Sequence, residues 1–322
     1  MLLRSIKICL LVLCLAELIS GIGLLLHYRA NTFEAFLSVQ SILNSENLRW
    51  FCYDLHKVGA NLLILFSFLY LFICLWQQRY RYWLVKIIFV VLLLLGSYSG
   101  NILPWSQLST WLLTALPSLN LKVSFLVHVI FIPIVLIILI SPFAKGGLRG
   151  IFLARVNPPK SPLPPFAKGG IPLRKGGNCF LFLIYLLIFL FFTLVSPNVF
   201  SIKLENFSAL MPLPVLYDYP PWYLAPWFAL YKSFGYTVFG LAVLVWFLVP
   251  LLLKPTKVSF EHQFHPLVVS LLLLCLIGLG ATGMHLHSTR SLLLAQCLTV
   301  IYFILWIGLI VYSRWRQDES EK

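Results

Sequence analysis

The chain has 322 residues, of which 60% are hydrophobic and only 11% carry a charge. A soluble globular protein of this length does not need so apolar a composition, and the apolar residues fall in long uninterrupted runs. The sequence therefore excludes an ordinary soluble domain and indicates an all-α integral membrane protein.

The apolar runs predict eight transmembrane helices, each long enough to cross about 30 Å of hydrocarbon. In chain order these spans are roughly 5–27, 52–76, 84–103, 122–142, 179–196, 235–253, 266–284 and 291–313. Because the number is even, both termini are expected on the same side of the membrane.

The basic residues indicate which side that is. Under the eight-span topology, 17 of the 24 Lys and Arg residues fall on the face that carries the termini. The positive-inside rule makes this face, and both termini, cytoplasmic. The net charge of +14 is then a topological signature and a preference for anionic lipid head groups, so we expect no nucleic-acid partner.

Two connections stand apart in composition. Residues 141–178 are rich in Pro, Gly, Lys and Arg and contain the near-repeats SPFAKGG and PPFAKGG, which predicts a low-complexity basic loop on the cytoplasmic face. It divides the chain into a four-helix N-terminal unit, residues 1–140, and a four-helix C-terminal unit, residues 179–322. Within the second unit, the proline- and aromatic-rich stretch 200–234 is expected along the outer interface.

His56 and His128 each lie inside a strongly apolar segment of membrane length, where an ionisable side chain is a candidate for function. Neutral imidazole binds iron through one ring nitrogen, so one histidine from each of two packed helices can hold a haem in a four-helix core. The alternative is that both histidines only join helices by bonding to backbone carbonyls. No CxxCH motif is present, so covalent haem attachment through that motif is not expected.

Several stretches together resemble one family, the cytochrome b subunit of quinol-oxidising bc1 and b6f complexes. They are SGIGLLLHY (Ser20–Tyr28), AFLSVQSIL (Ala35–Leu43), LHKVGAN (Leu55–Asn61), GNILPWSQLSTW (Gly100–Trp111), LVHVIFIPIV (Leu126–Val135) and PPWYLAPWFAL (Pro220–Leu230). Six motifs in the family's order run through nearly the whole chain. The resemblance implies a four-helix haem-binding bundle in residues 1–140, followed by a C-terminal four-helix domain.

In that family two histidines on the second helix and two on the fourth clamp two b haems, one in each leaflet. His56 and His128 match the outer pair. Fourteen residues after His56, about four helical turns, the chain has Tyr70 in place of a histidine, and the fourth helix also lacks its second ligand. The resemblance therefore implies one bis-histidine haem b. It also suggests that Gly21 and Gly100 let the haem approach, although plain helix packing explains each glycine equally well.

The family's outer quinol pocket carries a Pro-Glu-Trp-Tyr motif, which here reads Pro220-Pro221-Trp222-Tyr223. Proline cannot take a proton from a quinol, so Asp218, Glu205 or water would have to do so. The candidates for a retained quinol pocket are Pro220, Pro221, Trp222, Tyr223 and Asp218. Alternatively, Trp222 and Tyr223 are only anchors at the membrane interface.

The resemblance implies a subunit of a bc-type redox complex in an energy-transducing membrane. It would pass electrons between a membrane quinol and a redox partner on the outer face, with iron–sulfur or cytochrome c proteins as partners and a homodimer of the complex as an option. The second hypothesis is a degenerate relative that acts as a membrane anchor, electron conduit or scaffold without its own quinol site.

Overall fold

The computed structural model describes residues 2–46, 49–77, 79, 82–115, 120–140, 187, 189, 191, 193, 208–209, 221–231, 233–234, 264–284 and 289–320. Within these ranges the chain is helical, apart from turns and one isolated β-bridge between Ser106 and Ser208. The all-helical architecture predicted from the sequence is thus observed in the described part of the chain.

Six helical segments of the described chain are long and apolar enough to cross a membrane. They correspond to α1 (Leu2–Leu25), α3 (Arg49–Trp76), α4 (Trp83–Ile102), the continuous rod α6–η1–α7 (Leu121–Phe125, Leu126–Phe131 and Ile132–Ile140), α11 (Phe264–Met284) and α12 (Thr289–Ser320). The other two predicted spans, 179–196 and 235–253, fall almost entirely outside the described residues. The count of eight therefore stays a prediction, whereas six spans match in place.

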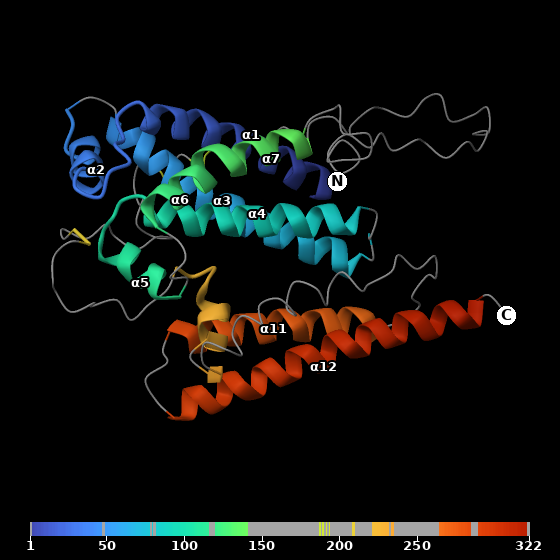
Figure 1. Cartoon of the computed structure of the whole chain (residues 1–322). Helices are drawn as coiled ribbons and strands as arrows, with labels where there is room; N and C mark the ends of the chain where they lie inside the picture. The colour runs from blue at the N-terminus through green and yellow to red at the C-terminus, as the bar shows by residue number, and fades with distance from the viewer. Residues whose placement is uncertain are drawn as a thin grey trace, which may run out of the picture.

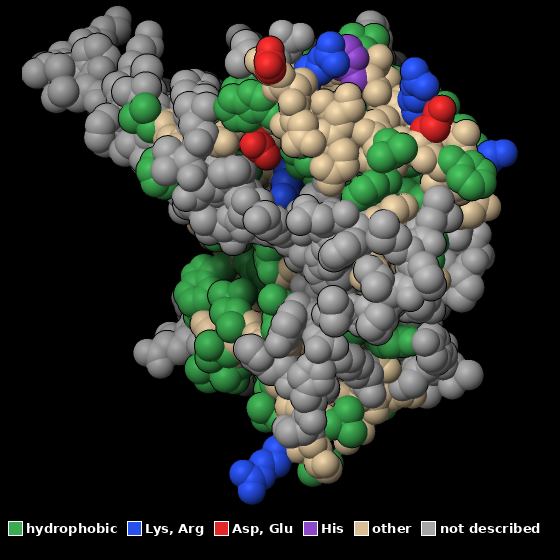
Figure 2. All heavy atoms as spheres, turned by 90° about the vertical axis from the view of Figure 1, so that its left-hand side faces the viewer, with side chains coloured by type: hydrophobic (Ala, Val, Ile, Leu, Met, Phe, Trp, Pro, Cys, Tyr) green, Lys and Arg blue, Asp and Glu red, His purple; other side chains and the backbone are tan. Residues whose placement is uncertain are grey.

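The spans run between two common ends of the molecule (Figure 1). The short helices α2 (Ala35–Leu43) and α5 (Gln107–Ala115) lie at one end, and the start of α1 and the end of α12 lie at the other. Figure 2 looks onto the α2/α5 end and shows acidic and basic side chains gathered in its upper part. This end therefore has the polar surface expected where helices emerge into water.

The short helix α2 is amphipathic, as the sequence predicts for a segment that rests on the membrane interface. Its buried residues are Ala35, Phe36, Val39 and Ile42, which recur at the spacing of one helical face. That face covers the α2/α5 end of the first helices, so α2 caps the bundle there.

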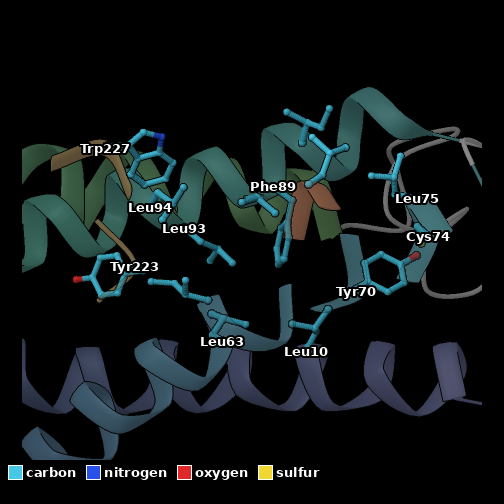
Figure 3. Close-up of a cluster of buried hydrophobic side chains, with 14 of the residues drawn as sticks. Leu10, Leu63, Tyr70, Cys74, Leu75, Phe89, Leu93, Leu94, Tyr223 and Trp227 are labelled. Carbon is cyan, nitrogen blue, oxygen red and sulfur yellow. The ribbon is translucent and has the colours of Figure 1, made fainter. Parts of the chain in front are cut away.

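Away from that end, the first helices enclose a tightly packed core (Figure 3). Leu10, Leu63, Tyr70, Phe89 and Leu93 are all at most 7% exposed. Buried apolar side chains of this kind pack closely against one another. The half of the bundle around Tyr70 is therefore apolar packing between helices.

Two basic side chains lie against Tyr70 at this core, Lys86 and Lys7, whose Nζ is 5.9 Å from the centre of the ring. Lys86 is 5% exposed, its Nζ donates a hydrogen bond to the backbone carbonyl of Arg79 at 2.5 Å, and it lies 5.7 Å from the centre of the Tyr70 ring. A cation against an aromatic face is attracted by the negative charge of the ring face. Tyr70 thus has a structural partner in the position where the family would place a second pair of ligands.

Candidate functional site

The two intramembrane histidines face each other from different helices. His56 lies two turns into α3, and His128 lies in the π-helix η1. Their ring centroids are 5.9 Å apart and the ring planes are nearly perpendicular, at 84°. Two metal–imidazole bonds of about 2 Å on opposite sides of one ion would place the centroids roughly 6 Å apart. The spacing of the rings therefore fits a shared metal ion.

The segment that carries His128 toward this partner is a π-helix. Asn120 begins the helix by accepting a hydrogen bond from the backbone N–H of Val123 at 2.9 Å, and the chain widens into η1 one turn later. A π-helix adds a residue to the turn and is less stable than an α-helix, so it persists mainly where function requires it. Here it places a histidine on the inner face of the bundle.

The hydrogen bond made by His128 shows which of its nitrogens carries the proton. Its Nδ1 lies 2.7 Å from the carbonyl oxygen of Gly96 on α4. A carbonyl can only accept, so Nδ1 must donate and Nε2 keeps its lone pair. This is the tautomer that a metal ligand needs.

The same assignment follows for His56, whose Nδ1 has two oxygen neighbours. The Ser20 hydroxyl is 3.1 Å away and already donates its own hydrogen to the carbonyl of Ala16 at 2.7 Å. The carboxylate oxygen Oε2 of Glu17 is also 3.1 Å away. Because its hydrogen is engaged by the Ala16 carbonyl, the Ser20 oxygen is the acceptor for Nδ1–H, and this arrangement leaves Nε2 of His56 with a lone pair as well.

Gly21 and Gly100 lie directly against the two rings. A Cβ on Gly100 would be 2.6 Å from His128 Cε1, and one on Gly21 would be 3.2 Å from His56 Cε1. The absence of a side chain is therefore required at Gly100 and favourable at Gly21 for the rings to take these positions. Both glycines predicted from the sequence belong to the site through this contact.

A cavity of about 440 Å³ surrounds the pair. It is lined by both histidines, by both glycines and by residues of α1, α2, α3, α4 and η1. Its volume falls within the roughly 300–1,000 Å³ of cofactor and small-molecule sites. In the described residues there is no group of three or more His, Cys, Asp or Glu side chains that could hold a metal ion by itself. The two histidines are thus the residues of this cavity that would hold the iron of a haem.

Pro221 and Tyr223 line the same cavity. Tyr223 is 4% exposed, and its phenol oxygen accepts hydrogen bonds from Ser97 Oγ at 2.5 Å and from Asn101 Nδ2 at 2.6 Å. Burial raises the pKa of Tyr223 to about 12 despite these two donors, so the phenol is protonated at physiological pH.

Trp222 is also held within the bundle, because its Nε1 donates to Asn61 Oδ1 on α3 at 2.9 Å. Both Trp222 and Tyr223 thus contact the helix bundle, and their position relative to the membrane interface stays a prediction. The two other residues of the predicted quinol pocket, Pro220 and Asp218, lie outside the described residues.

Glu17 is the site residue that the sequence prediction missed. The signal available was that it is the sole acidic residue within the first apolar span. The helix-to-helix contacts of Asn61, Ser97 and Asn101 were missed as well, since small polar residues in such helices give no pattern of their own.

Comparison with known proteins gives one consistent result. A family model for the cytochrome b/b6/petB N-terminal domain matches residues 5–145, and a model for the cytochrome b C-terminal/b6/petD domain matches residues 216–303. Cytochrome b of Dictyostelium citrinum is 24% identical, with 94% of this chain and 86% of that protein covered, and cytochrome b of Rhodospirillum rubrum is 24% identical, with 92% and 81% covered. A chain of a hyperthermophilic respiratory Complex III has the same fold, with a TM-score of 0.78 at 22% identity over 98% of this chain and 92% of that one.

Proposed function

Because this chain belongs to the cytochrome b family, whose N- and C-terminal domain models together match more than two thirds of it, we propose that it is the haem-carrying membrane subunit of a bc-type respiratory redox complex. Its task is to hold one haem b and to pass electrons between a membrane quinol and a redox protein at the α2/α5 end of the bundle. A haem supplies one-electron oxidation and reduction, and this chain supplies its position and surroundings.

The observation that carries this proposal is the arrangement of the two histidines. Each ring has its Nδ1–H engaged by a fixed acceptor, the carbonyl of Gly96 for His128 and the Ser20 and Glu17 oxygens for His56. Each therefore presents an Nε2 lone pair, and the ring centroids are 5.9 Å apart. The alternative of two helix-joining histidines does not require the free nitrogens of both rings to share a cavity.

A single haem is favoured by what lies around Tyr70. That residue is 14 positions after His56, at the level where a second haem would bind, and it is packed against Lys86 in the closed core. Neither α3 nor the rod α6–η1–α7 carries a second histidine at that level. Electrons therefore enter and leave at the α2/α5 end, unless a partner subunit supplies a further cofactor.

A quinol pocket is supported by the buried Tyr223. With its oxygen accepting from Ser97 and Asn101, its own hydrogen remains available as a donor to a ligand in the cavity. The donor suits the oxygen of a quinone ring, and the apolar Pro221 beside it suits the ring face. Pro220, Trp222 and Asp218 complete the proposed pocket, with Asp218 as proton acceptor in place of the missing glutamate.

The organisation predicted from the sequence completes the proposal. Residues 1–140 form the haem bundle, residues 141–178 a basic cytoplasmic loop, and residues 179–322 the second unit, with both termini cytoplasmic. Iron–sulfur or cytochrome c subunits are the proposed partners at the α2/α5 end, with a homodimer of the complex as an option. A scaffold without redox chemistry is less favoured, because helix packing alone does not require both histidines to line one cavity of about 440 Å³.

The test is haem retention in single variants. His56→Ala and His128→Ala should each abolish the reduced-minus-oxidised haem b absorbance while the protein stays membrane-inserted. His27→Ala is the matched control, since His27 is exposed in the turn after α1 and is expected to keep the full signal. Full haem content in both ligand variants would refute the assignment, and a wild type without haem would favour the scaffold.

A further inference from the structure

Glu17 is an acidic side chain inside α1, a helix long and apolar enough to cross a membrane. A carboxyl group in such a place is costly and requires a partner or a function. Its partner is His56, with Oε2 of Glu17 3.1 Å from Nδ1, and only 14% of the Glu17 side chain is exposed. The contact joins α1 to α3 at the ring that faces the cavity.

The surrounding chain is shaped to admit this carboxylate. A methyl group at Gly59, one turn after His56 on α3, would overlap Oε1 of Glu17. Oε1 itself is buried and has no hydrogen-bond partner among the described residues. The carboxylate therefore gains nothing from Oε1, and what keeps it in the helix interface is its bond to His56.

The two histidines differ in the groups that contact their Nδ1 atoms. His128 is backed by a neutral carbonyl, whereas His56 is backed by a hydroxyl and a carboxylate. When a carboxylate accepts the Nδ1–H of a metal-bound histidine, it fixes the ring and makes the other nitrogen a stronger electron donor. A histidine that is a stronger electron donor stabilises the oxidised state of the iron more than the reduced state.

We infer that Glu17 is a positioning residue for His56 that lowers the reduction potential of the haem held between His56 and His128. The inference rests on the proposed function, because it requires that haem. Gly59 contributes to the same arrangement, because the absence of a side chain there provides the space that the carboxyl group of Glu17 occupies.

The experiment compares Glu17→Gln and Glu17→Leu by redox titration of the purified protein. Glu17→Gln keeps a carbonyl oxygen of the same shape and removes the ionisable carboxyl group, so haem content should stay near that of the wild type while the midpoint potential rises. Glu17→Leu removes the acceptor as well, and haem affinity should fall by about tenfold to a hundredfold, the usual loss when such a partner is removed. Glu34→Gln is the matched control, because Glu34 is exposed and paired with Arg29 away from the histidines.

A second variant reaches the same carboxylate from the opposite helix. Gly59→Ala should displace Glu17 and raise the potential in the same direction as Glu17→Gln, without changing any charge. A wild type that contains no haem would overturn the proposed function and this inference together. A haem-containing wild type whose potential is unchanged in Glu17→Gln and Gly59→Ala would overturn this inference alone.

Discussion

Substitution of Gly100 by Ala tests how strictly the site depends on the absence of a side chain. The added Cβ would lie 2.6 Å from Cε1 and 2.9 Å from Nδ1 of His128. Ordinary contact between carbon atoms begins at about 3.5 Å, so the ring must move by roughly 1 Å. A shift of that size also breaks the 2.7 Å hydrogen bond to the carbonyl of Gly96.

These two effects set the expected magnitude. Overpacking costs about 1–3 kcal/mol and the lost hydrogen bond about 1 kcal/mol. The ring can turn away when no haem is bound, so the cost falls on haem binding and not on folding. Because about 1.4 kcal/mol corresponds to a tenfold change in affinity, Gly100→Ala should weaken haem binding by roughly 30-fold to several hundredfold.

Two other glycines complete the series. Gly21→Ala meets His56 Cε1 at 3.2 Å, where a shift of a few tenths of an ångström relieves the contact, so its effect should be under about tenfold. Gly308 on α12 has no atom within 4 Å of an added Cβ and is the control. The haem affinities of the three variants can be ranked by their haem content after purification and by the rate of haem transfer to an apo-protein acceptor. Equal haem affinity in Gly100→Ala and Gly308→Ala would refute the reasoning.

Three further predictions concern the Tyr223 network. Tyr223→Phe leaves the donors Ser97 and Asn101 without their acceptor and should lower stability by about 1–3 kcal/mol, measured by thermal unfolding in detergent. Burial raises the pKa of Tyr223 from 10.0 to about 12, so the stability that the protonated phenol contributes is complete below pH 10 and is lost as the pH rises toward 12. The stability of Tyr223→Phe should therefore fall less between pH 10 and pH 12 than that of the wild type. An equal fall in both proteins would contradict this prediction. Trp222→Phe removes the donor to Asn61 and should cost about 1 kcal/mol in the same assay, with no loss of haem.

The placement of the spans could be predicted from the sequence because it depends on local hydropathy. Runs of about 20 apolar residues must be helical in a membrane, where no water satisfies the backbone. The first four predicted spans and the last two match the observed helices within a few residues. The pairing of His56 with His128 was likewise predictable, since two isolated histidines in such helices need partners.

The contacts between helices could not be predicted in the same way. Glu17 and His56 are 39 residues apart, and nothing in either segment indicates which turn of α1 faces which turn of α3. Trp222 and Tyr223 have the composition of interface anchors, yet the fold turns them inward onto Asn61, Ser97 and Asn101. Such contacts depend on the rotation and depth of each helix, which tertiary packing determines.

The closed core around Tyr70 has an electrical consequence. The histidine pair lies near the α2/α5 end, and Tyr70 is 14 residues or about 21 Å farther along α3, beyond packed apolar side chains. Moving one elementary charge across the whole membrane changes its energy by about 2.3 kcal/mol per 100 mV. If the proposed haem at the histidine pair is the only one, an electron that enters and leaves at the same end traverses little of that field, and we expect its transfer to be nearly independent of membrane voltage.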